Sequence, residues 1–202
     1  MFSAVMAGSL LFSLLTPVAA PGKVVIDVVK VNGSGCRKPT TQVAVSPDGE
    51  AFTVTYSEYL AQVGVGAKPN DYRKDCRITL RLDIPAGLTY AIQEVDYRGF
   101  GLLEPGASGV QSASYQFQTQ PKPEPASHTF RGPFNDGWLN ADVTDPADRS
   151  WSPCGKSRKL TIDTELRVSA GTSDPKTTTS MLGMDSTDGS IKTTYRFIWR
   201  GC

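Results

Sequence analysis

The sequence predicts an all-β fold: an antiparallel β-sandwich, jelly-roll-like or Greek key, with two disulfides. Apolar and polar side chains alternate with a period of two along several short segments. Turn residues separate these segments at close intervals, at residues 46–49, 85–87, 135–137 and 188–189, and the 19 glycines and 14 prolines supply many of them. A helical period is confined to residues 57–63, where it predicts a turn or two of helix.

In the clearest strands apolar and polar residues alternate strictly, so these strands are expected to have one apolar face and one solvent-exposed face. Strands are predicted in chain order at residues 23–31, 52–56, 77–84, 112–117, 127–131, 160–169 and 195–199. Residues 23–31 are more continuously apolar, which is typical of a strand covered on both faces. Thr164 is a polar residue on the otherwise apolar face of its strand.

An N-terminal leader is predicted at residues 1–20, followed by one secreted domain at residues 21–202. Residues 6–15 form an apolar run of signal-peptide length, and Val18-Ala19-Ala20 supplies the small residues that precede cleavage. The run is too short to span a bilayer. We therefore expect an extracellular protein that leaves the membrane once the leader is removed. Proline is poorly tolerated directly after a cleavage site, so Pro21 leaves the exact position of cleavage undetermined.

Composition restricts the classes of partner. Lys and Arg total 21 against 20 for Asp and Glu, a net charge of +1, which argues against nucleic acid as a partner. One histidine and four cysteines leave little material for a metal site, and no cofactor is expected. A monomer is expected.

Secretion predicts that the four cysteines pair, because an oxidising compartment favours disulfides. Three connectivities are open. Proximity in the sequence and the proline-rich gap between the halves favour Cys36 with Cys76 and Cys154 with Cys202. The zinc alternative lacks a Cys-x-x-Cys pair.

The proline-rich segment at residues 119–125 has two interpretations. It is either a linker between two domains or a long crossover loop within one sandwich. We favour the loop, because two halves of about 100 residues would each need a separate core.

Several short motifs, spread over nearly the whole chain after the leader, together resemble one family. They lie at residues 32–36, 52–59, 73–76, 95–100, 152–155, 185–188 and 199–202. In this combination the chain resembles the family called domain of unknown function 4360, secreted proteins of fungi and actinobacteria. The resemblance implies one extracellular β-rich domain with four cysteines. It implies no activity and carries over no catalytic residue.

The main ligand-binding candidates are Asp96, Tyr97, Arg98 and Phe100, next to a glycine at the end of an alternating strand. Arg supplies a planar fork of donors and an aromatic ring supplies a stacking face, which suits a sugar or a carboxylate. The alternative is a bend in which Asp96 and Arg98 pair while the rings pack. Trp138 is a further candidate, and its alternative is to fill the core.

Other motifs give weaker signals. Asp185 and Asp188, with hydroxyls between them, are oxygen ligands of the kind calcium prefers, but we favour the alternative of a plain turn. Asn32 begins an Asn-Gly-Ser glycosylation pattern, and the alternative is that Gly-Ser-Gly forms a tight turn before Cys36. The acidic group in residues 142–148 is expected to face water.

No catalytic residue is assigned. His128 is the single histidine, and no Gly-x-Ser-x-Gly motif accompanies it. The sequence thus favours a non-catalytic binding module for wall polysaccharide or another extracellular protein. The alternatives are a polysaccharide hydrolase using a carboxylate pair, such as Asp96 with Glu104 or Asp185, and a structural or coat protein.

Overall fold

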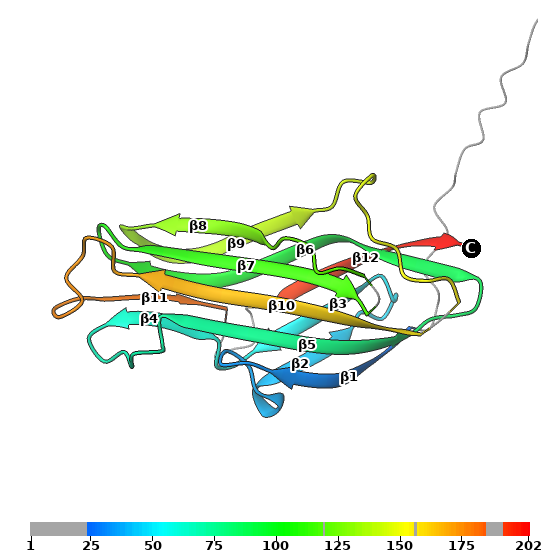
Figure 1. The fold of residues 1–202 in the computed structure, drawn as a ribbon, viewed down its shortest axis with the longest axis horizontal. Coiled ribbons are helices and arrows are strands. Elements are labelled where there is room, and N and C mark those ends of the chain that lie inside the picture. Colours follow the sequence, from blue (N-terminus) through cyan, green and yellow to red (C-terminus); the bar gives the residue numbers. More distant parts are fainter. Residues whose placement is uncertain (1–23, 119, 156, 185–191) are drawn as a thin grey trace, which may run out of the picture.

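The computed structural model describes residues 24–118, 120–155, 157–184 and 192–202, and it shows two stacked antiparallel sheets (Figure 1). The elements are β1 (Val25–Asn32), η1 (Lys38–Thr40), β2 (Thr41–Val45), β3 (Ala51–Tyr56), β4 (Leu60–Gly64), β5 (Arg73–Asp83), β6 (Leu88–Leu103), β7 (Ser108–Phe117), β8 (Ala126–Arg131), β9 (Phe134–Val143), β10 (Arg158–Ser169), β11 (Thr179–Gly183) and β12 (Thr193–Gly201). The all-β sandwich prediction is confirmed.

Two sheets of unequal size form the layers. Sheet A has the order β1-β5-β10-β7-β8, and sheet B has the order β2-β3-β12-β6-β11-β4, with β9 also on β6. β12 and β9 both pair with β6 at residues 94–96, so they lie on opposite edges of that strand. β11 and β9 both pair with it at residues 100–102. The 16-residue β6 is thus the spine of sheet B, with β12 and β11 along one edge.

The core lies between the inner faces of the two sheets. Ile78, Leu80 and Leu82 from β5 are at most 1% exposed, as the alternation of that segment predicted. Sheet B contributes mostly aromatic rings, including Phe52 and Tyr195, whose ring centroids stack 4.6 Å apart. Burial of this apolar surface is the main term that stabilises the fold.

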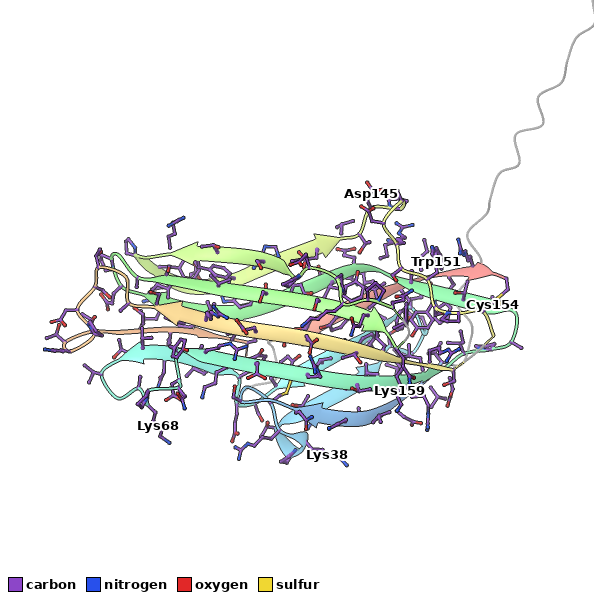
Figure 2. All side chains as sticks on the ribbon, in the orientation of Figure 1. Lys38, Lys68, Asp145, Trp151, Cys154 and Lys159 are labelled. Atoms are coloured by element: carbon purple, nitrogen blue, oxygen red, sulfur yellow. A yellow bond between two sulfur atoms is a disulfide. The ribbon has the colours of Figure 1, made fainter. Side chains whose placement is uncertain are left out.

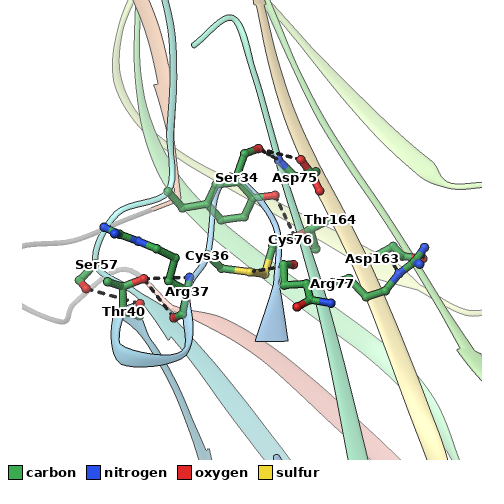
Figure 3. The surroundings of a disulfide bond; sticks show 12 residues. Ser34, Cys36, Arg37, Thr40, Ser57, Asp75, Cys76, Arg77, Asp163 and Thr164 are labelled. Carbon is green, nitrogen blue, oxygen red and sulfur yellow. Dashed lines mark hydrogen bonds and ion pairs between the residues drawn. A yellow bond between two sulfur atoms is a disulfide. The ribbon is translucent and has the colours of Figure 1, made fainter. Parts of the chain in front are cut away.

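Both predicted disulfides are present. Cys36 is joined to Cys76 of β5 with 5.3 Å between the Cα atoms (Figure 3), and Cys154 is joined to Cys202 with 5.9 Å between them. Trp151 lies at the same end of the molecule as Cys154 (Figure 2), and the Arg200 guanidinium carbon lies 3.8 Å from the centre of its ring. The first bridge attaches the segment after β1 to β5, and the second attaches the segment between β9 and β10 to the residue that follows β12.

Three sequence predictions of local structure are wrong. The segment 23–31 is not covered on both faces: β1 is an edge strand, and Val25, Val28 and Val29 are 38–45% exposed. The helical turn in 57–63 is replaced by β4. Residues 135–137, read as a turn, lie within β9 because that segment pairs with β6. Pairing with distant strands determines the structure of these segments, as is common where the local propensity is weak.

The proline-rich segment connects β7 to β8, which pair with each other in sheet A. Residues 1–20, the predicted leader, lie outside the described residues. Within the described residues, no helix is long and apolar enough to cross a membrane.

Candidate functional site

The outer face of β6 carries three of the five predicted ligand-binding residues. Successive side chains of a strand point to opposite faces, so Asp96, Arg98 and Phe100 share one face. That face is turned away from the core: Arg98 is exposed, and Phe100 is 43% exposed. We call these three residues the β6 platform.

A hollow of about 600 Å³ lies over β3, β12 and β6 on this outer face. Asp96 and Arg98 both line it, together with Thr53, Gln93, Thr194 and Arg196. Side chains from three strands therefore present hydroxyl, amide and charged groups to one space.

Asp96 and Arg98 do not pair with each other. Arg196 of β12 donates from Nη2 to Asp96 Oδ2 at 2.6 Å, and its Nε lies 3.6 Å from Glu94 Oε2. Among the described residues, Arg98 takes part in no ion pair. The platform thus combines a neutralised carboxylate with a guanidinium that has no carboxylate partner within the described part of the chain.

Phe100 has open space beside its ring. Its partner in the register with β9 is Gly137, which has no side chain to cover the ring. Leu139, opposite Arg98 in the same pairing, is 55% exposed and continues the apolar surface. An aromatic face that remains this open suits stacking against a flat or ring-shaped ligand.

The other two predicted residues lie on the inner face. Tyr97 is 1% exposed, and burial, with Asp142 nearby, raises the pKa of its hydroxyl well above the ordinary value. Trp138 is 7% exposed and packs on Gly99 and on Phe130, with 5.1 Å between the two ring centroids. The structure therefore divides the five residues between two faces of sheet B, and Trp138 fills the core.

A second hollow, of about 490 Å³, lies on the outer face of sheet A, where no sequence motif predicted a site. Asp163 accepts from Arg77 Nε at 2.5 Å and lies 3.3 Å from Lys122 Nζ. Burial disfavours the charged form of Asp163, but the hydrogen bonds from Arg77 and Lys122 outweigh it and lower the pKa of this carboxyl. The sequence signal that could have revealed this hollow was the row of charged residues along the predicted solvent-exposed strand faces.

The remaining candidates are Asn32, which is among the residues that line the second hollow, and the calcium pair. Asn32 is exposed at the end of β1, and the Ser34 hydroxyl of its glycosylation pattern donates to Asp75 Oδ1 at 2.7 Å. Asp185 and Asp188, the calcium candidates, fall outside the described residues. In the parts of the chain that the structure describes, no group of three or more His, Cys, Asp or Glu side chains is arranged to hold a metal ion.

Comparison with known proteins places the chain among secreted relatives. The sequence model of a family described as domain of unknown function (DUF4360) matches residues 22–202. A protein of Arthroderma benhamiae described as an uncharacterized secreted protein is 32% identical over 182 residues, which cover 90% of this chain and 73% of that protein.

One solved structure, the enzymatically active domain of bacteriophage CBA120 tailspike protein 4, matches 86% of this chain at 10% identity. This chain spans 19% of that one, and the TM-score is 0.25. A similarity at this level carries no argument about fold or function.

Proposed function

This chain belongs to the DUF4360 family, and from that membership and the geometry of sheet B we propose that it is a secreted, non-catalytic module that binds wall polysaccharide through the β6 platform. The predicted leader and the secreted relative support a location outside the cell. The two disulfides suit the same compartment.

The observation that carries the proposal is the single row formed by Phe100, Arg98 and Asp96. Neighbours in this row are two residues apart on a strand, which is about 7 Å. An exposed ring stacks on the apolar face of a sugar, while a guanidinium fork and a carboxylate bind its hydroxyls. The spacing allows one short glycan to contact all three groups.

The test is binding of immobilised and soluble polysaccharides, with a glycan array to find the ligand. We expect saturable binding that Phe100→Ala and Arg98→Ala each weaken about tenfold, the loss of one stacking or charge-assisted contact. Tyr72→Ala is the matched control, because Tyr72 is 48% exposed and lies outside the platform.

Three outcomes would contradict the proposal. Unchanged affinity in Phe100→Ala and Arg98→Ala would place the ligand elsewhere. Release of reducing sugar would favour the hydrolase. Capture of a purified extracellular protein, with no glycan bound, would favour the protein-binding alternative.

A further inference from the structure

Asn32 is the last residue of β1, and its side chain lies on the outer face of sheet A. Its register partner on β5 is Arg77, and directly opposite side chains of an antiparallel pair share one face. Arg77 is exposed, whereas its neighbours Cys76 and Ile78 are buried in the core. The exposed amide of Asn32 therefore lines the hollow of about 490 Å³ on this face, which we call the sheet A hollow.

A tight turn explains the three residues that follow Asn32. A Cβ atom at Gly33 would overlap the Asp75 carbonyl oxygen, and one at Gly35 would overlap an aromatic ring. The Ser34 hydroxyl donates to Asp75 Oδ1 at 2.7 Å and accepts from the Asp75 amide at 3.1 Å (Figure 3). In the described part of the chain, the Asn32 amide can form hydrogen bonds only with its own strand, so the packing of the sheets does not require it.

A row of polar side chains leads from Asn32 across the outer face of sheet A. Arg77 of β5 is opposite Asn32 and also opposite Asp163 of β10, and all three residues line the sheet A hollow. Two strand spacings make this row about 10 Å long. Lys122, 52% exposed, reaches the same carboxylate with 3.3 Å from Nζ to Oδ2. Guanidinium, carboxylate and ammonium groups all form hydrogen bonds with the hydroxyls of a sugar.

Residues 32–34 supply the asparagine, the non-proline residue and the hydroxyl of an N-glycosylation acceptor, and no other asparagine of the sequence begins this pattern. We propose that Asn32 carries an N-linked glycan when the chain is secreted by a host that glycosylates, and that the first sugars of this glycan lie over the sheet A hollow. The site is on the opposite sheet from the β6 platform and does not rest on the function proposed for it.

The modification is a transfer from an oligosaccharide donor that the secretory pathway supplies as a lipid diphosphate. Asn32 Nδ2 forms a bond to C1 of the first N-acetylglucosamine and loses one proton. The bond between C1 and the diphosphate oxygen breaks, and the lipid diphosphate leaves with the electron pair of that bond.

The folded segment fixes when the transfer takes place. Asp75 occupies the Ser34 hydroxyl both as donor and as acceptor, and the Gly35 amide donates to the Asp75 carbonyl oxygen at 2.8 Å. The disulfide between Cys36 and Cys76 closes the same segment. The acceptor hydroxyl is thus engaged once the chain has folded, so the transfer precedes formation of this disulfide.

The first experiment is mass spectrometry of the full chain secreted from yeast, before and after an amide-cleaving glycosidase. We expect one glycan per chain, and its removal should leave an Asn32→Asp conversion. Asn32→Gln and Ser34→Ala should lose the glycan, and Ser34→Thr should keep it. Asn70→Gln is the matched control, because Asn70 is exposed and begins no acceptor pattern. A parent chain without glycan, or a glycan retained in Asn32→Gln, would overturn the proposal.

The order of events is tested with purified oligosaccharyltransferase and lipid-linked donor acting on unglycosylated chain made in bacteria. The reduced, unfolded chain should accept the glycan, and the folded chain with its disulfides formed should lose this ability. Equal transfer to the two forms would contradict the order.

The position of the glycan is tested by acylation of lysines. Lys122 should react severalfold more slowly in the glycosylated chain than in Asn32→Gln, while Lys68, exposed and outside the sheet A hollow, should react equally in both. Equal reaction of Lys122 in the two forms would show that the sugars do not cover the hollow. Polysaccharide binding at the β6 platform should be the same in both forms, so the two proposals fail independently.

Discussion

The hydroxyls of Tyr59 and Thr164 lie 3.0 Å apart in the buried interior, and they join the two sheets. Tyr59 directly precedes β4 in sheet B, and Thr164 belongs to β10 in sheet A. The contact explains the polar residue on an otherwise apolar strand face. A buried hydroxyl is tolerated because another hydroxyl satisfies it.

Thr164→Val should destabilise the protein, because it keeps the shape of the side chain and leaves the Tyr59 hydroxyl buried without a partner. We expect a loss of about 1–3 kcal/mol in the free energy of unfolding, measured by urea denaturation. Adding Tyr59→Phe should recover part of the loss. If Thr164→Val alone were as stable as the parent, the contact would contribute nothing.

Alkaline pH should unfold the protein through its buried tyrosines. Tyr56, Tyr59, Tyr90, Tyr97 and Tyr195 are each at most 2% exposed, and burial raises the pKa of every one. In the unfolded chain they ionise near pH 10. Their stabilising effect is therefore complete below about pH 10 and is lost as the pH rises above it.

Tyrosinate absorbance and circular dichroism, followed together, check this expectation. The buried tyrosines should ionise only as the strand signal disappears. Ionisation of all seven tyrosines while the dichroism remains native would show that the rings are accessible.

Gly99→Ala should damage the core beneath the β6 platform. A Cβ atom at Gly99 would overlap the Trp138 ring and the carbonyl oxygen of Gly183. Overpacking of this kind costs about 1–3 kcal/mol, which thermal or urea unfolding would measure. Gly137→Ala is the control, since its Cβ would lie 3.7 Å from the nearest atom, the Gly99 carbonyl oxygen. Equal stability of the two variants would contradict the packing argument.

Asp163→Asn should lower stability at neutral pH and have little effect in acid. The lowered pKa of Asp163 means that its contribution is present above about pH 4, the unfolded value, and is lost as the pH falls through its folded pKa. Solvent screening limits the expected loss to about 1 kcal/mol or less. A difference between variant and parent that stayed constant from pH 7 to pH 2 would assign the effect to something other than charge.

The alternation of apolar residues was enough to predict β5 and β10, because those strands bury one face along most of their length. The same alternation places Tyr97 on the opposite face of the strand from Asp96 and Arg98. Grouping these neighbouring residues into one candidate site overlooked this difference. The pairing of Arg196 with Asp96 and the position of Gly137 opposite Phe100 depend on the strand register between distant segments. No local sequence pattern contains that register. His128 Nε2 of β8 and Asp142 Oδ1 of β9 lie 2.7 Å apart, and this contact could be predicted only once the positions of both strands were known.

The proline-rich segment between β7 and β8 forms a shared wall. Lys122 and Pro125 line the hollow on sheet A, whereas Pro123 and Glu124 line a different hollow of about 500 Å³. Alternating prolines hold a chain extended and leave it little conformational freedom to lose. A ligand that bound beside this wall would need no loop to order first, and its association rate would be governed by diffusion and charge.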